Sequence, residues 1–191
     1  PGNYQNQCGS TATGPSEEQR IVGLPWAAAL THAHTTRQSL AAVFDCEGAP
    51  FFMHLIDTRM QLAGVSIVRA SDSAVRVDGG SVVLTSLDIA DSTTVERGGG
   101  LRVVGQATVV MAGVVVRGCS SPQSGGGVYA GGESTLVFDT VQAEAVALST
   151  GLLVDNCTAP VGGGLHCVDC SMLTDIDQVW VLRGCVGDSG G

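Results

Sequence analysis

A short segment, HCVDC, carries the residues best suited to bind a metal or to undergo redox chemistry. His166, Cys167 and Cys170 could supply three ligands to zinc, but zinc sites take four and the sequence identifies no fourth. A redox-active Cys-x-x-Cys normally opens a helix, which lowers the pKa of its thiols, whereas this pair follows a glycine-rich segment. We therefore favour a local disulfide between Cys167 and Cys170, and we expect no metal and no cofactor.

Two other polar pairs offer weaker chemistry. His32 and His34 would not share one face of a helix, because side chains two residues apart do not. Asp175 and Asp177 could contribute to a calcium site, but as alternate residues of a strand both would point outward as solvated carboxylates. No Ser/His/Asp set and no carboxylate pair stands at a recognisable catalytic spacing, so the sequence predicts no catalytic residues and no enzyme.

The chain has seven cysteines in 191 residues, which exceeds typical cytosolic usage. Because they form no double Cys-x-x-Cys zinc pattern, an oxidising compartment is the better explanation. Cys8 and Cys46 could tie the N-terminal segment to the first repeat. All seven are candidates for disulfides: Cys8, Cys46, Cys119, Cys157, Cys167, Cys170 and Cys185.

Four segments that end in consecutive glycines resemble one another: IADSTTVERGGGL, VVRGCSSPQSGGGV, LVDNCTAPVGGGLHC and VLRGCVGDSGG. They start at Ile89, Val115, Leu153 and Val181, so the starts are 26, 38 and 28 residues apart. Self-similarity at this spacing is typical of stacked-repeat folds. A phosphate-binding loop would occur once and would open a helix, which these segments do not. We expect a tight corner at the first glycine of each copy, namely Gly98, Gly125, Gly162 and Gly190.

Alignment of the four copies places charges of alternating sign at one position. If neighbouring copies stack, these residues form a ladder of ion pairs that fixes the register, and each exposed pair contributes at most about 1 kcal/mol. The alternative is a carboxylate and arginine cluster of the kind that a polysaccharide lyase uses. Such a cluster needs charges that converge on a groove, so we favour the ladder. Its members are Asp91, Arg117, Asp155 and Arg183.

The same alignment places Cys119, Cys157 and Cys185 in one column. Stacked neighbours would satisfy the Cα separation of a disulfide, about 4.4–6.8 Å, so Cys157 could pair with either of the other two. Buried free thiols are the alternative. Asn156, Cys157 and Thr158 also form a glycosylation sequon, which can be used only if the corner exposes Asn156.

The composition limits the possible partners. The chain has no lysine and nine arginines, and its formal net charge is −9, which argues against binding to a nucleic-acid backbone. Apolar residues make up 44% of the chain but aromatic residues only 4%, so the core is built from small and β-branched side chains that suit strands. No apolar run is long enough to span a membrane, and no signal peptide is visible. We expect both ends of the sequence to be cut.

The pattern of apolar and polar residues changes near residue 43. Residues 1–42 read as a polar arm followed by an Ala- and Leu-rich helix at about 24–42, with Pro25 in its first turn, which would cap the structure that follows. Residues 43–191 consist of short apolar pieces separated by Gly and polar corners, as strands would be. The predicted organisation is an N-terminal arm and capping helix (1–42) and a repeat domain (43–191) that is incomplete at its C-terminus.

A unit of about 27 residues with three short strands and three corners describes a right-handed parallel β-helix. The segments LVDN and GGGL resemble the repeats of chlamydial polymorphic outer-membrane proteins and related surface proteins, whose Gly-Gly-Ala-apolar tetrapeptide follows an aromatic-x-x-Asn. This chain has a third glycine in place of the alanine, and Ser92, Gly118 and Gly184 where Asn156 stands. The resemblance covers about residues 43–191 and implies an all-β fold, a right-handed parallel β-helix with an N-terminal capping helix.

Two hypotheses for function follow from this fold. The first is an extracellular or cell-surface structural and adhesive module, non-catalytic, that stacks on further copies or protein partners, with carbohydrate as a further candidate partner. The second is a carbohydrate-active enzyme, a polysaccharide lyase or a pectinase-like hydrolase, which would require Asp and Arg from at least three coils to meet in one groove. An intracellular structural role is a third option, and a count of seven free thiols would favour it.

Overall fold

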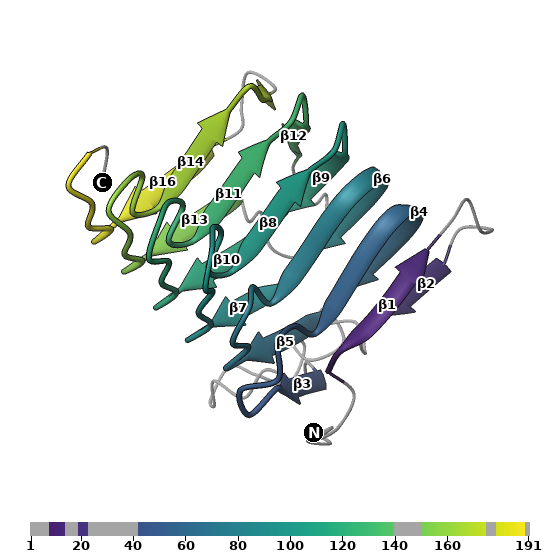
Figure 1. Cartoon of the computed structure of the whole chain (residues 1–191). Coiled ribbons are helices and arrows are strands. Elements are labelled where there is room, and N and C mark those ends of the chain that lie inside the picture. The colour runs from purple at the N-terminus through teal and green to yellow at the C-terminus, as the bar shows by residue number, and fades with distance from the viewer. Residues whose placement is uncertain (1–7, 14–18, 23–41, 140–149, 175–178, 190–191) are drawn as a thin grey trace, which may run out of the picture.

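Every paired strand in the protein runs parallel to its neighbours (Figure 1). The computed structural model describes residues 8–13, 19–22, 42–139, 150–174 and 179–189, and these residues include no helix. The strands form two sheets. The larger one has ten strands: β1 (Ser10–Thr13), β2 (Gln19–Val22), β4 (Met53–Ala63), β6 (Val75–Thr85), β8 (Leu101–Val104), β9 (Thr108–Ala112), β11 (Val128–Gly131), β12 (Thr135–Phe138), β14 (Leu165–Val168) and β15 (Ser171–Thr174).

Two long strands give the larger sheet its curl. β4 and β6 each have 11 residues and pair along nearly their whole length. The first half of β6 pairs with β8 and the second half with β9, so the sheet continues from β6 as two wings. One wing is β8-β11-β14 and the other is β9-β12-β15.

Left-handed backbone conformations produce the bend between the wings. In β4 the bend lies at Asp57, with φ 50°, and in β6 at Gly79 and Gly80, with φ 76° and 81°. In the next layer Gly105 and Gln106, with φ 69° and 59°, turn the chain between β8 and β9. Because these conformations recur at one edge in successive layers, the bends stack on one another.

The smaller sheet has six strands in the order β16-β13-β10-β7-β5-β3. Its strands pair in register, so that Val116 of β10 lies between Ile89 of β7 and Val154 of β13. Alternate side chains of each strand point inward, where those three are fully buried. The strands are β3 (Ala42–Asp45), β5 (Val65–Val68), β7 (Asp88–Ala90), β10 (Val114–Arg117), β13 (Thr150–Asp155) and β16 (Val179–Arg183).

Between the sheets lies a core of Val, Leu, Ile and Met with few aromatic side chains. Glycine triplets connect the smaller sheet to the first wing, and Gly98, Gly125 and Gly162 have φ of 75°, 63° and 56°. The second glycine of a triplet is required for a different reason: a Cβ on Gly126 would meet the carbonyl oxygen of Gly163 in the next layer. Gly190, the fourth predicted corner, lies outside the described residues.

The sequence correctly predicted an all-β structure of parallel strands, but the predicted right-handed parallel β-helix with an N-terminal capping helix is wrong. That prediction assumed three short strands and three corners per unit. Instead, β4 and β6 continue through one of these corners, so the strands collect in a larger sheet that curls almost into a barrel and a second, smaller sheet. The predicted helix at 24–42 falls outside the described residues except for Ala42, which begins β3.

Candidate functional site

Four of the seven cysteines are paired. Cys8 is bonded to Cys46 with a Cα separation of 5.4 Å, and Cys167 to Cys170 with a Cα separation of 5.6 Å. The first disulfide attaches the segment that contains β1 to the end of β3. The second closes the turn between β14 and β15, so the HCVDC segment is a cross-linked corner and supplies no free thiol.

The remaining three cysteines are free thiols stacked in one column. Cys119 and Cys157 are buried, and Cys185 is half-buried. A hydrogen bond with Cys157, together with burial, raises the pKa of Cys119, and burial raises the pKa of Cys185. Raised pKa values keep Cys119 and Cys185 protonated at neutral pH, so these two pack as small apolar groups rather than act as nucleophiles, whereas the hydrogen bond with Cys119 lowers the pKa of Cys157.

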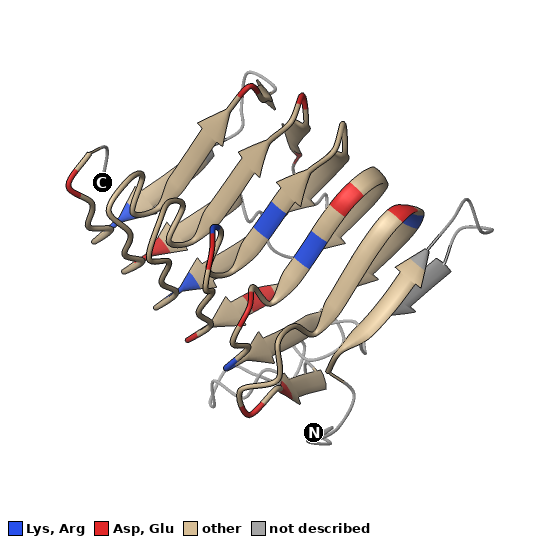
Figure 2. Ribbon diagram, viewed as in Figure 1, with Lys and Arg blue, Asp and Glu red and all other residues tan. Residues whose placement is uncertain are grey.

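The four residues predicted to form a charge ladder lie on the strands of the smaller sheet or directly after them. Arg117 lies opposite Asp155, and Asp155 opposite Arg183, but the residue opposite Arg117 on β7 is Ala90 and not Asp91 (Figure 2). Asp91 follows the strand, with φ 52°, one residue beyond the position that pairs with Arg117. The residues therefore do not form a continuous ladder but separate ion pairs.

Each of these ion pairs joins two guanidinium nitrogens, Nε and Nη2, to both oxygens of a carboxylate. Arg117 donates from Nε and Nη2 to Asp88 at 2.9 and 2.8 Å, and Arg183 donates to Asp155 at 3.0 and 2.6 Å. Hydrogen bonds from Arg183 lower the pKa of the Asp155 carboxyl, and those to Asp88 raise the pKa of Arg117. Because these donors are already engaged, the pairs fasten adjacent strands and offer little to a ligand.

The sequon asparagine is accessible. Asn156 is exposed and has φ 52°, and its backbone N–H donates to the carbonyl oxygen of Arg183. Thr158 is also exposed. Cys157 between them points into the core and is fully buried. Asparagine tolerates the left-handed region better than most residues, which explains why it can occupy this corner position.

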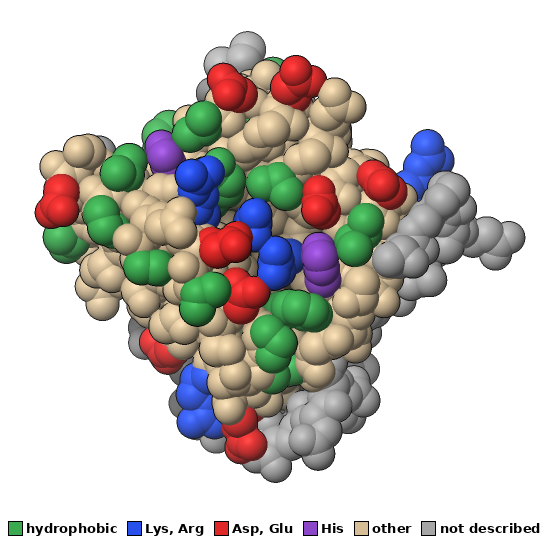
Figure 3. Space-filling view, viewed as in Figure 1, with side chains coloured by type: hydrophobic (Ala, Val, Ile, Leu, Met, Phe, Trp, Pro, Cys, Tyr) green, Lys and Arg blue, Asp and Glu red, His purple; other side chains and the backbone are tan. Residues whose placement is uncertain are grey.

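A row of polar side chains that the sequence did not reveal crosses the outside of the first wing. Its members, which we call the outer row, are paired in register on five consecutive strands, β4, β6, β8, β11 and β14. Basic residues lie side by side on β6 and β8 (Figure 2), and charged side chains gather near the middle of this face (Figure 3). The outer row is His54, Arg76, Arg102, Tyr129 and His166.

Acidic residues of the adjoining loops hold the two central arginines. Arg76 Nη1 donates to Asp72 Oδ2 at 2.8 Å, and Thr94 fixes the other oxygen of Asp72 with a hydrogen bond of 2.9 Å. Arg102 Nη1 donates to Glu96 Oε2, also at 2.8 Å. Only 22% of each arginine side chain is exposed. The two guanidinium groups, on neighbouring strands about 4.8 Å apart, are thus held near each other despite their like charge.

A third arginine covers the tyrosine of the row. Arg97, in the loop between β7 and β8, donates from Nη1 to the Tyr129 hydroxyl at 2.9 Å and from Nε to Gln123 at 3.3 Å. Its Cζ lies 5.2 Å from the centre of the Tyr129 ring, which is a cation–π distance. On the other side, His166 approaches the same ring edge-on at 5.8 Å. Tyr129 is therefore buried and organises two polar neighbours.

The row contains polar atoms whose bonding capacity is unused. Arg102 Nε and His166 Nδ1 are inaccessible to solvent and have no hydrogen-bond partner among the described residues, an arrangement that costs about 1–3 kcal/mol for each group. Burial, and next the positive charge of Arg76, lower the pKa of His54. His54 is thus neutral at pH 7 and can accept as well as donate a hydrogen bond.

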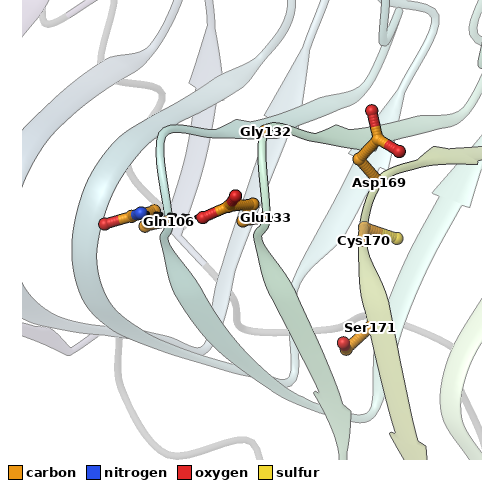
Figure 4. Close-up of a pocket in the computed structure, with 6 residues that line it drawn as sticks. All are labelled: Gln106, Gly132, Glu133, Asp169, Cys170 and Ser171. Carbon is orange, nitrogen blue, oxygen red and sulfur yellow. Dashed lines mark hydrogen bonds between the residues drawn. The ribbon is translucent and has the colours of Figure 1, made fainter.

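A second polar region lies at the bend edge of the second wing. Gln106, Glu133 and Asp169 line a hollow of about 740 Å³ together with Gly132, Cys170 and Ser171 (Figure 4). Gln106 Nε2 donates to Glu133 Oε2 at 2.8 Å. Within the described residues, no group of three or more His, Cys, Asp or Glu side chains is arranged to hold a metal ion. We therefore regard the outer row as the candidate site.

A signal for the outer row is present in the sequence. Arg102, Tyr129 and His166 each stand two residues after a glycine triplet, at the same position of three repeat copies. Aligned by their glycines, the copies therefore place these three side chains on one face. His54 and Arg76 precede the first triplet and could be added only once β4 and β6 were known to pair with β8.

Comparison with known proteins adds no relative: no family model, no curated protein and no solved structure matches this chain. Among the residues that the structure describes, none belongs to a helix long and apolar enough to cross a membrane. The functional argument therefore depends on the site itself.

Proposed function

We propose that this chain is a non-catalytic structural and adhesive module of an extracellular protein or a cell surface, and that the outer row is its binding face. The observation that carries the proposal is the in-register placement of His54, Arg76, Arg102, Tyr129 and His166 across five strands. A rigid sheet presents such a row already ordered, whereas a loop would lose conformational entropy when it binds. The two disulfides favour an oxidising compartment.

An enzyme of the lyase or pectinase type is less well supported by the same face. Asp72 and Arg76 come from one repeat unit, and Glu96, Arg97 and Arg102 from the next. The third unit contributes no Asp or Arg to the face among its described residues, so the convergence from three coils that such an enzyme would need is not met. Asp72 and Glu96 are also held by arginines, rather than left as a free acid and a free base.

Adhesion and catalysis are separated by two measurements on the purified, oxidised chain. Beads coated with the folded chain should adhere to a layer of glycosylated cells more strongly than beads coated with the reduced and unfolded chain. Incubation with polymers of uronic acids should give no product by mass spectrometry. Equal adhesion of the two kinds of bead would refute the adhesive role, and shortened or unsaturated sugars would replace it with the enzyme.

A further inference from the structure

We infer that the outer row binds an acidic saccharide, with Arg76 and Arg102 together holding its carboxylate or sulfate group. This inference rests on the proposed function and names its ligand class. It also identifies the ligand by chemistry that Arg97, Glu96 and His166 contribute around the two arginines.

The arginines of the two sheets differ in how many of their nitrogens bind an acid. On the smaller sheet Arg117 and Arg183 each use Nε and Nη2 on a carboxylate. On the first wing Arg76 and Arg102 each bind their acid through Nη1 alone. Arg76 Nε and Nη2 and Arg102 Nη2 have no partner among the described residues, whereas Arg102 Nε is inaccessible to solvent, so a carboxylate or a sulfate would meet two donors of Arg76 and one of Arg102.

The arginines that carry these unpaired donors are neighbours on the sheet. Arg76 and Arg102 are directly opposite each other on β6 and β8, with Arg97 over the following strand. Arg97 engages its Nε and Nη1 but no described residue accepts from its Nη2. The loop carboxylates Asp72 and Glu96 pair with Arg76 and Arg102, and Asp78, two residues beyond Arg76 on the same face of β6, is exposed. An anion on this face is therefore held by the unpaired guanidinium donors and not by an excess of positive charge.

Hydrogen-bond acceptors beside the arginines favour a saccharide over other anions. Acceptors stand directly beside the arginines, since Glu96 Oε1 has no partner among the described residues and half of the Glu96 side chain is exposed. Sugar hydroxyls can donate to such acceptors, whereas a nucleic acid or a polyphosphate has closely spaced negative charges that Asp72 and Glu96 would repel. A ligand with occasional acidic groups and many hydroxyls matches this mixture of donors and acceptors.

The outer row is long enough for a short oligosaccharide. Four strand spacings of about 4.8 Å separate His54 from His166, so the outer row extends over about 19 Å. Polar side chains line this distance without interruption, and Tyr129 positions Arg97 and His166 in the second half of the row. A short oligosaccharide can lie across the strands, with its acidic group over Arg76 and Arg102.

The test is a titration of the full chain with three probes: an oligogalacturonate, which has carboxylates only, a dextran sulfate, which has sulfates only, and neutral dextran. We expect one or both anionic probes to bind, more weakly at higher salt, and neutral dextran not to bind. Binding of oligogalacturonate alone assigns the carboxylate and binding of dextran sulfate alone assigns the sulfate. Equal binding of neutral dextran, or no binding of either anionic probe, overturns the inference.

A pair of double variants tests whether the outer row is responsible. R76Q/R102Q removes two positive charges from the first wing, and the matched control R117Q/R183Q removes two from the smaller sheet. We expect the first to weaken anion binding by about tenfold or more and the second by less than about twofold, because only the first removes direct contacts. Equal weakening would mean a general charge effect and would refute the site. Circular dichroism and urea midpoints establish that both variants are folded, and R76K/R102K replaces the first variant if it is not.

The bead assay distinguishes failure of this inference from failure of the proposed function. If R76Q/R102Q beads adhere to cells as well as the unaltered chain does, adhesion stands and the saccharide site is refuted. If the unaltered chain does not adhere but binds the anionic probes through Arg76 and Arg102, the site stands and the adhesive role is refuted.

Discussion

Substitution of Gly126 by alanine tests whether the stacked glycine turns determine the spacing of the layers. A Cβ on Gly126 would lie 2.5 Å from the carbonyl carbon of Thr158 and still closer to the carbonyl oxygens of Thr158 and Gly163. Favourable contacts between carbon atoms begin at about 3.5 Å, so the overlap is about 1 Å. All three atoms belong to the backbone of the next layer, which cannot rotate away as a side chain could.

The expected loss of stability is large for a single methyl group. Overpacking of a well-packed interior typically costs about 1–3 kcal/mol, and Gly126 lies at the upper end or beyond because the obstruction is backbone on two sides. We therefore expect G126A to lower the free energy of unfolding by about 3 kcal/mol or more. The control is G48A, where a Cβ meets nothing within 4 Å. It should cost only the left-handed conformation at φ 85°, about 1–2 kcal/mol.

Urea unfolding followed by circular dichroism measures both variants, and the shift in midpoint multiplied by a shared slope gives each difference in free energy. The two variants add the same methyl group, and G48A also carries the cost of a left-handed conformation that Gly126 does not adopt, so their difference is a lower bound on the cost of the contact with the next layer. If G126A is no less stable than G48A, the turns are not in contact as described, and the layer spacing has another origin.

Three further predictions concern the ends of the strands. The pKa of Asp155 is held below its ordinary value of 3.8 by Arg183, so the pair stabilises the fold above that pH and the contribution is lost as pH falls through the lowered pKa. Acid titration of D155N should therefore show a shallower loss of stability below pH 4 than the unaltered chain, and an unchanged slope would contradict the pairing. Secretion from eukaryotic cells should give a glycan that N156Q removes, seen as a fall in mass, and a chain of unmodified mass would show that the sequon is not used. Titration with a thiol reagent under denaturing, non-reducing conditions should count three thiols, and a count of one would instead indicate a further disulfide among Cys119, Cys157 and Cys185.

The sequence predicted the parallel stacking because the glycine triplets mark equivalent places in successive layers. Gly98, Gly125 and Gly162 share a left-handed conformation, and the strands that follow them pair in register. The alignment placed Arg117 opposite Asp155 in the same way. It misplaced Asp91 by one residue, because the loops of the first two copies pair from Thr93 with Ser120 to Arg97 with Ser124, so that Ala90 and not Asp91 is equivalent to Arg117. A shift of one residue moves a side chain to the other face of a strand, so alignment by spacing alone does not determine which charges meet.

The two-sheet arrangement could not be read from the sequence, because residues 43–85 contain no triplet. In β4 the bend is made at Asp57, a residue with a side chain, and it takes the partner glycines of β6 to show that the strand continues through it. The outer row was missed for a related reason. A column of charges or of cysteines is visible in the sequence because its members are of one kind, whereas Arg102, Tyr129 and His166 share a position and not a type.

The difference between the two sheets explains how one fold can use arginine for two purposes. Where the acid lies on the neighbouring strand, as Asp155 does for Arg183, both Nε and Nη2 of the guanidinium donate to it. Where the acid lies in a loop beside the strand, as Glu96 does for Arg102, the carboxylate reaches only Nη1. The loop that supplies the acid also supplies Arg97. Glu96 and Arg97 directly precede the glycine triplet that ends this loop, so we expect G126A, at the corresponding position of the next layer, to weaken anion binding as well as stability.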